Sequence, residues 1–233
     1  MTGSEVRQRL LAMQDTGYQA FQQRLLPTLA PETILGVRAP ALRALARALV
    51  QEGGAEEFMR ALPHRYWEEN TLHGYLIAQL RVYDEVLAAL DVFLPHVDNW
   101  ATCDQLRPQV FRTRRPPLDK IRGWMDAKHA FTVRFGIEML QQYYLDEAFD
   151  PAYLEWVAAL RCEEYYVHMM VAWFFATALT KQYEAALPYL RARRLDRITH
   201  NKAIGKAIES CQIAAARKDV LRGLRWKQDE DAE

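Results

Sequence analysis

The stretch PALRALARALV, residues 40–50, decides the fold. Apolar residues recur in it at spacings of three and four, which places them on one face of an α-helix. This apolar stripe consists of Leu42, Leu45, Ala46 and Leu49. Alternating strand patterns are absent from the sequence, and glycine is scarce, with 10 in 233 residues. The sequence therefore predicts an all-α protein.

The same helical spacing returns along the whole chain. It is found in HGYLIAQLRVYDEVLAALDVFL (73–94), RFGIEMLQQYYL (134–145), PAYLEWVAAL (151–160), YYVHMMVAWFFATAL (165–179), YEAALPYLRA (183–192) and NKAIGKAIESCQI (201–213). The breaks fall at LAPE, EGG, LPH, RRPP and AFDP, where proline or glycine interrupts a helix or opens the next one. The pattern predicts roughly a dozen helices of about ten to eighteen residues, joined by short loops.

Antiparallel helix pairs stacked as a solenoid fit this layout. Each pair buries its apolar face only against its neighbours, and one surface of the stack is left concave. No strict sequence period is visible, so any repeats are degenerate, and a compact helical bundle is the alternative. No change in composition marks a linker. We expect a single domain over residues 1–228 and an acidic tail at residues 229–233.

The three cysteines, Cys103, Cys162 and Cys211, lie far apart, with no CxxC pair and no histidine cluster at ligand spacing. Neither a disulfide framework nor a metal site is expected, and a reducing compartment fits this usage. No apolar run reaches the length of about 18 residues that a membrane helix needs, and the N-terminus has no apolar signal core. We expect a soluble cytoplasmic protein.

Charge is balanced overall, with 30 basic and 30 acidic residues, but it is unevenly distributed. Residues 105–128 contain seven basic and two acidic side chains, and residues 181–228 contain twelve basic and four acidic ones. Separate basic patches on a neutral chain fit a polyanionic partner bound on one face. Ordinary solvated helix surface is the alternative.

The stretch DNWATCD, residues 98–104, combines an indole with carboxylates. Asp98 or Asn99 can cap a helix, because each side chain can accept a bond from a backbone N–H two or three residues later. Trp100 and Asp104 then lie four residues apart on one helical face. In a groove, the pair would place a flat π-face beside a negative charge. The alternative is that Trp100 is a core residue.

Two further side chains are unusual for their surroundings. Arg134 lies in an otherwise apolar helix, and burying an arginine is costly unless it is paired. It can bridge to an acid such as Asp104, contact a phosphate, or reach the surface. Trp173 belongs to the aromatic segment 163–181, which has more large rings than one packed stripe requires, so one ring can face a groove. His168, in the same segment, is expected to make a polar contact rather than to bind a metal.

Several catalytic signatures are missing from the sequence. It contains no nucleophile elbow, phosphate-cradling glycine loop, HExxH motif or dinucleotide fingerprint. GVRAPALR, residues 36–43, has one glycine before a predicted helix start. We expect a turn there, with Arg38 and Arg43 available for anions near the helix N-terminus.

Five stretches together resemble the DNA alkylation repair family, the AlkD-like alkylpurine glycosylases. They are ILGVRAPALRALA (34–46), VDNWATCD (97–104), FTVRFGIEMLQQYYL (131–145), YYVHMMVAWFFATAL (165–179) and LDRITHNKAIGKAIES (195–210). The resemblance implies a right-handed superhelical solenoid of HEAT-like helix pairs with a concave basic groove. It also implies a monofunctional DNA glycosylase that hydrolyses the N-glycosidic bond of positively charged alkylated purines, such as 3-methyladenine and 7-methylguanine.

The resemblance also assigns roles to residues. The catalytic set that it implies is Asp104, Trp100, Trp173 and Arg134. The predicted DNA-binding residues are Arg38, Arg43, Arg112, Arg114, Arg115, Lys202 and Lys206. The expected partner is double-stranded DNA with alkylated bases. No cofactor, metal or membrane is expected, and the protein is expected to act as a monomer in the cytoplasm, on the nucleoid when bound to DNA.

One stretch departs from the family pattern. Some members add an aromatic residue from the N-terminal helices to the groove, but the loop LLPTLAPET before ILGV contains no ring, and Tyr18 and Phe21 lie earlier. From a different functional class, the alternative is a non-catalytic helical-repeat binder of damaged or branched DNA, or of a protein.

Overall fold

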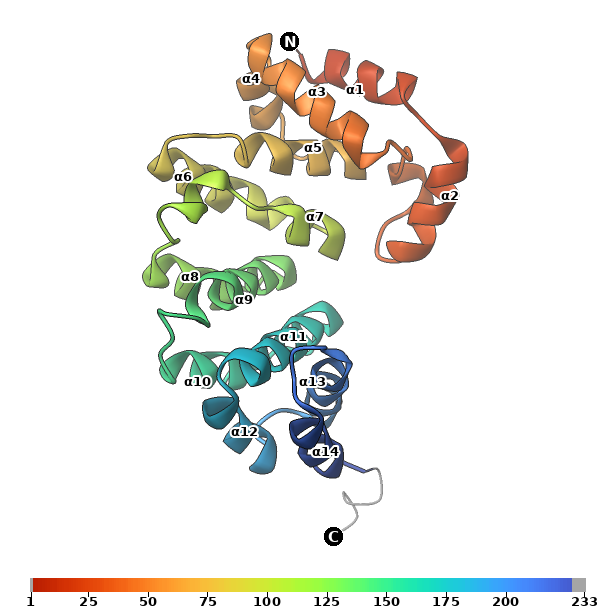
Figure 1. The fold of residues 1–233 in the computed structure, drawn as a ribbon. Coiled ribbons are helices and arrows are strands. Elements are labelled where there is room, and N and C mark those ends of the chain that lie inside the picture. The colour runs from red at the N-terminus through yellow and green to blue at the C-terminus, as the bar shows by residue number, and fades with distance from the viewer. Residues whose placement is uncertain (1, 228–233) are drawn as a thin grey trace. The chain divides into compact units, whose positions relative to one another are not determined.

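The computed structural model describes residues 2–227, and every regular element in that range is a helix. The described residues form fourteen α-helices and three short 3₁₀ helices, and Figure 1 labels the α-helices. The predicted all-α class is confirmed. The predicted acidic tail, residues 229–233, lies outside the described range.

The chain divides into two compact units, the N-terminal unit Met1–Arg115 and the C-terminal unit Pro116–Glu233. A single domain over residues 1–228 stays a prediction. The N-terminal unit contains α1 (Gly3–Ala12), α2 (Thr16–Leu25), η1 (Pro31–Thr33), α3 (Ala39–Gln51), α4 (Ala55–Arg60), α5 (Trp67–Ile77), α6 (Tyr83–Phe93), η2 (Leu94–His96), α7 (Trp100–Gln105) and η3 (Gln109–Arg112).

The C-terminal unit contains seven further helices in the described residues. They are α8 (Leu118–Met125), α9 (Ala130–Tyr144), α10 (Ala152–Ala158), α11 (Tyr165–Lys181), α12 (Tyr183–Arg191), α13 (Arg197–Glu209) and α14 (Ala215–Gly223). Several helices are shorter than the ten residues expected. The segment 73–94, for example, is divided between α5 and α6, although neither proline nor glycine stands at residues 78–82 to predict the break.

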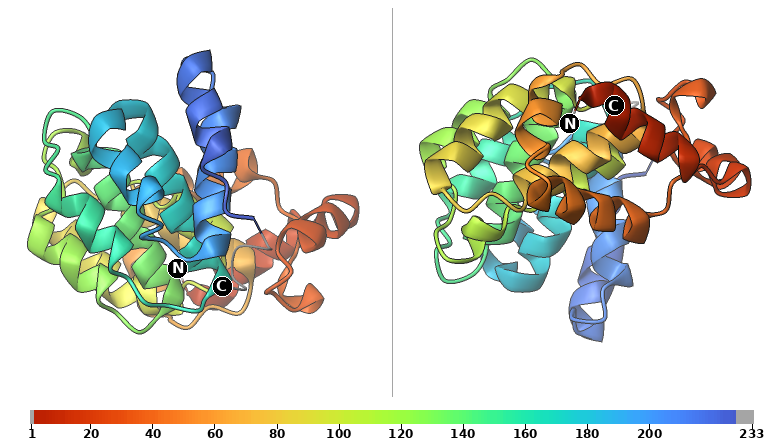
Figure 2. Two further views of the ribbon diagram at one scale, coloured as in Figure 1. Left: turned by 90° about the horizontal axis from the view of Figure 1, so that it is seen from below. Right: turned by 90° about the horizontal axis from the view of Figure 1, so that it is seen from above.

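Within each unit, alternate helices stack on one another. In the N-terminal unit, α3 packs on α5 and α5 on α7, as Figures 1 and 2 show for α3 and α5, while α4 and α6 lie against α5. In the C-terminal unit, α9 packs on α11 and α11 on α13, while α8 packs on α9 and both α10 and α12 pack on α11. Alternation of this kind is typical of helical-repeat folds. The apolar stripe of α3 is buried, as predicted from its spacing.

A buried carboxylate holds the turn before α3. Glu68 of α5 accepts hydrogen bonds from the backbone N–H groups of Leu35 (3.0 Å), Gly36 (2.6 Å) and Val37 (3.2 Å). Gly36 has a φ of 83°, and a Cβ there would lie 2.2 Å from the backbone oxygen of Asp15. Burial raises the pKa of the Glu68 carboxyl above its ordinary value, while the amide bonds act in the opposite direction. The turn predicted at GVRAPALR is therefore filled by an acid of the chain itself.

Close backbone packing brings α8 against α9. A Cβ on Gly136 of α9 would lie 2.9 Å from the backbone nitrogen of Met125, at the end of α8. Only glycine allows that approach without a shift of the backbone. Gly136 thereby fixes the middle of α9, where Arg134 lies two residues earlier.

Candidate functional site

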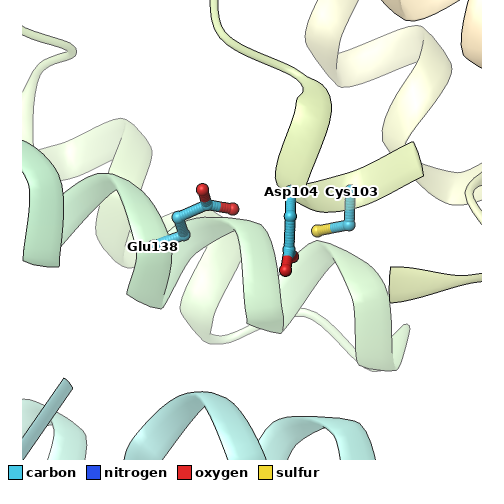
Figure 3. Close-up of side chains that lie close together, drawn as sticks. All are labelled: Cys103, Asp104 and Glu138. Atoms are coloured by element: carbon cyan, nitrogen blue, oxygen red, sulfur yellow. The ribbon is translucent and has the colours of Figure 1, made fainter. Parts of the chain in front are cut away.

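Helix α7 positions Trp100 and Asp104. Asn99 is its N-cap, because the Asn99 side chain accepts a bond from the Thr102 N–H at 2.8 Å, so Asn99 rather than Asp98 is the cap. Cys103 is buried, and the half-buried Asp104 follows it at the end of the helix, where Figure 3 shows their side chains next to one another. A cap and a buried inner face thus hold this short helix.

The indole of Trp100 is half-buried rather than a core residue. Its Nε1 donates a hydrogen bond to the Leu25 carbonyl oxygen at 3.0 Å, so it is tied to the end of α2. The ring packs against an apolar cluster of Leu26, Ile34, Trp67 and Ala101. The indole therefore has a fixed position, with part of its surface open to solvent.

Arg134 of α9 is buried, with 3 % of its surface exposed. Its Nη1 donates to the Tyr166 carbonyl oxygen at 2.8 Å, and its guanidinium carbon lies 5.8 Å from the centroid of the Trp173 ring. The interpretation of Arg134 as a surface side chain is wrong, because α11 covers it. Glu138, one turn further along α9, is also buried, and Figure 3 shows its side chain projecting from that helix.

Trp173 of α11 is 40 % exposed, so it is not an ordinary core residue. Lys206 Nζ of α13 lies 4.5 Å from its ring centroid. Trp173 and Lys206 line a hollow of about 450 Å³ together with Gln141, Thr177 and Glu209. Burial lowers the pKa of Lys206 most, and the nearby Lys202 and Arg134 lower it further, against the opposing effect of Glu209. The C-terminal unit thus brings Arg134, Trp173 and Lys206 together.

Three of the predicted DNA-contact arginines of the N-terminal unit lie on aromatic rings. Arg38 forms an ion pair with Asp15 at 2.9 Å and lies 4.5 Å from the centroid of the Tyr18 ring. Similar ring contacts are made by Arg43 over Tyr75 (5.2 Å) and by Arg114 over Tyr83 (3.9 Å). Arg112, Arg115 and Lys202 are exposed. Of this group, Arg38 already has an acidic partner.

Helix α2 is a feature that the sequence did not connect with Trp100. Tyr18 and Phe21 lie on it with their ring centroids 5.9 Å apart, and Phe21 is 46 % exposed. The same helix ends at Leu25, whose carbonyl oxygen accepts the bond from Trp100. Tyr18 and Phe21, which precede LLPTLAPET in the sequence, therefore lie on the helix to which Trp100 is bonded. Local sequence patterns could not predict the contact between α2 and Trp100, because 75 residues separate Leu25 from Trp100.

His168 makes the polar contact predicted for it. Its Nδ1 lies 3.1 Å from Asp196 Oδ2 and 2.8 Å from Thr199 Oγ1. Asp196 also caps α13 by accepting from the Thr199 N–H at 3.0 Å. These contacts tie the start of α13 to α11.

The candidate residues of each unit thus come from the helices that stack on one another. α7 carries Trp100 and Asp104 in the N-terminal unit, and α9, α11 and α13 carry the cluster of the C-terminal unit. Indole faces beside a carboxylate or beside cations suit a ligand that has both positive and negative parts.

The chain matches the family model described as DNA alkylation repair enzyme over residues 6–208, and it belongs to that family. Membership supports a role in DNA repair, with DNA as the substrate. A comparison with curated proteins finds no match to this chain. Among residues 2–227, no helix has the length and apolar character needed to cross a membrane.

Proposed function

We propose that the protein is a monofunctional DNA glycosylase for positively charged alkylated purines, such as 3-methyladenine and 7-methylguanine. The observation that carries this proposal is the fixed pair on α7, where the half-buried Asp104 follows the half-buried Trp100 by one helical turn. Family membership supports the same assignment. We further propose that the protein acts as a monomer in the cytoplasm, on the nucleoid when bound to DNA.

The chemistry needs little from the protein beyond a well-placed negative charge. An N-alkylated purine already carries the positive charge that a general acid would otherwise create. Departure of the base leaves an oxocarbenium-like sugar, as in glycoside hydrolysis. The Asp104 carboxylate stabilises that cation and orients water, and preorganised charge of this kind contributes about 3–4 kcal/mol to such transition states. The open part of the Trp100 ring adds a cation–π contact of roughly 0.5–2 kcal/mol.

We assign the cluster of the C-terminal unit to contact with the DNA backbone. Arg134, bonded to the Tyr166 carbonyl, holds its positive charge behind the Trp173 ring, and Lys206 lies over that ring. We assign Trp173 to a base and Lys206 to a phosphate of the DNA, while the buried Arg134 adds positive charge behind the ring. Contacts to phosphate position the duplex without reading its sequence.

Base release tests the proposal directly. Methylated duplex DNA is incubated with the wild type, Asp104→Asn and Asp84→Asn, and free 7-methylguanine is quantified by chromatography. Asp84 is the matched control, because it is an exposed carboxylate on α6. We expect release by the wild type and Asp84→Asn and at least a 100-fold loss with Asp104→Asn. Absence of release by the wild type rejects the activity, and equal release by all three proteins rejects the role of Asp104.

One observation favours a second candidate function, a non-catalytic binder of damaged or branched DNA. The indole N–H of Trp100 is already bonded to Leu25, so Trp100 has a structural use that does not depend on catalysis. This function predicts salt-dependent DNA binding that Asp104→Asn leaves intact or strengthens, with no base release. A chain without DNA affinity at low salt would favour a protein partner instead.

A further inference from the structure

Residues 224–226, after the end of α14, are held against α13 by hydrogen bonds between their backbone and side chains of α13. We call this segment the C-terminal strap. His200 Nε2 donates to the Leu224 carbonyl oxygen at 2.8 Å. Asn201 binds both backbone groups of Trp226, because its Nδ2 donates to the Trp226 oxygen at 2.8 Å and its Oδ1 accepts from the Trp226 N–H at 2.9 Å. The backbone is therefore fixed on both sides of residue 225.

The Trp226 ring anchors the strap a second time. Its centroid lies 6.0 Å from the buried His200 ring in an edge-on arrangement, and the Arg193 guanidinium carbon lies 4.8 Å from it. Burial lowers the pKa of His200, while the hydrogen bond to Leu224 acts in the opposite direction. Hydrogen bonds to its backbone and ring contacts of Trp226 together fix the position of the strap.

The strap places the side chain of Arg225 on the surface of α13. Arg225 Nη2 lies 4.0 Å from the position that a Cβ on Gly205 would take, so the guanidinium lies over the glycine. Arg225, Lys202 and Lys206 line one hollow of about 480 Å³. Ile198, which is exposed, adds an apolar wall to it.

Charge in this hollow is unbalanced. Glu209 is the single carboxylate among the residues that line it, against the three cations. The lowered pKa of Lys206 has burial as its main cause, with Lys202 as a further one. On the adjacent α14, by contrast, Arg222 forms an ion pair with Asp219. Cations gathered without matching acids attract an anion, and phosphate groups suit lysine and arginine together.

We propose that the C-terminal strap presents Arg225 as the third cation of a phosphate-binding site for the backbone of duplex DNA, with Lys202 and Lys206. The family match ends at residue 208, so Arg225 lies beyond it. The inference rests on the proposed function only in taking DNA as the ligand. It does not depend on base release.

Binding to an unmodified DNA duplex tests the site. Fluorescence anisotropy gives Kd over a series of salt concentrations for the wild type, Arg225→Gln and the matched control Arg222→Gln. Loss of one phosphate contact lowers the slope of log Kd against log salt by about one. We expect this change for Arg225→Gln and no change for Arg222→Gln. An unchanged slope for Arg225→Gln overturns the site.

Asn201→Ala tests the strap separately from the charge. It removes the two bonds to Trp226 and leaves every cation in place, and circular dichroism checks that it folds. We expect it to lower the salt slope as Arg225→Gln does, whereas a wild-type slope in folded Asn201→Ala overturns the role of the strap. Competition with inorganic phosphate at constant ionic strength is expected to be weak, and displacement of DNA by phosphate alone would make the site one for free phosphate.

The same proteins are assayed for release of 7-methylguanine. If Arg225→Gln lowers the salt slope of DNA binding but the wild type releases no base, this site is supported and the glycosylase activity is rejected. Base release with a slope that does not depend on Arg225 rejects this site alone. The two proposals therefore fail independently.

Discussion

The turn before α3 and the hollow on α13 both gather groups that attract an anion, but only one of them is filled by the chain. At the turn, Glu68 occupies the amides of Leu35, Gly36 and Val37. At the hollow, Lys202, Lys206 and Arg225 face one carboxylate, Glu209. The turn is therefore bonded to α5 within the fold, whereas the hollow is available to an external phosphate.

This difference teaches that a glycine-containing turn and a row of cations cannot be judged by their own residues alone. The turn attracted a prediction of anion binding because Arg38 and Arg43 flank a helix start. The amides of the turn bind Glu68, 32 residues after Gly36 in the sequence, and Arg38 pairs with Asp15. The deciding residue is the one that supplies, or fails to supply, the opposite charge.

The largest effect is expected from removing the internal acid. Glu68→Ala leaves three buried N–H groups without an acceptor, and each such group costs about 1–3 kcal/mol. We expect the free energy of unfolding to fall by about 4 kcal/mol, measured by urea denaturation. Glu85→Gln, at an exposed carboxylate of α6, is the control and should change it by less than about 0.5 kcal/mol. A small loss for Glu68→Ala would mean that the turn does not depend on its acid.

The second prediction concerns the pH dependence of stability. The helix that carries Glu68 also carries the buried His73, which resists protonation in the folded protein. Burial lowers the pKa of His64 to about 4 and that of His73 to about 3, and their rings share a hydrogen bond of 2.9 Å. Both are neutral when folded, while the unfolded chain binds protons below about pH 6.5. Stability is therefore full above pH 6.5 and is lost as the pH falls toward 4, by about 3 kcal/mol or more.

Urea denaturation between pH 7 and pH 4 measures this loss. No histidine is among the described residues that line the hollow on α13, so acid separates the two regions. A flat profile from pH 7 to pH 4 would contradict the burial of neutral histidines.

The smallest effect on DNA binding is expected for Arg38→Gln. It removes one positive charge at the turn, as Arg225→Gln does at the hollow. Arg38 already pairs with Asp15 and lies on the Tyr18 ring. Arg38→Gln should change the salt slope of DNA binding by less than about 0.3, against about one for Arg225→Gln. Its effect on stability should stay below about 1 kcal/mol, because the ion pair is exposed. Equal slopes for the two variants would mean that internal pairing does not decide which arginines bind DNA.

Much of the fold could be predicted because helix-forming residues repeat with a clear period. The buried stripe of α3 and the breaks at EGG, RRPP and AFDP follow from local chemistry. The break between α5 and α6 could not be predicted, because no helix-breaking residue marks it. Every residue of α5 is buried, including Glu68 and His73, although polar residues in a sequence suggest an exposed face.

The candidate site could be predicted in part for the same reason. One helical turn relates Trp100 to Asp104, so local spacing predicts that they share a face. The contact of Arg134 with the ring of Trp173 and the bond of Trp100 to Leu25 depend on packing between helices far apart in the sequence. Arg225 carried no motif, and only the contacts of Asn201 and His200 with the strap reveal its place.

The most direct test of the central claim is the single-turnover rate constant for 7-methylguanine release from a duplex with one lesion. Wild type and Asp104→Asn are compared at saturating protein, with Kd for the same duplex measured in parallel. The account predicts a rate constant at least 100-fold lower for Asp104→Asn, with binding unchanged or tighter. Equal rate constants would contradict it, because the carboxylate at residue 104 would then take no part in breaking the bond.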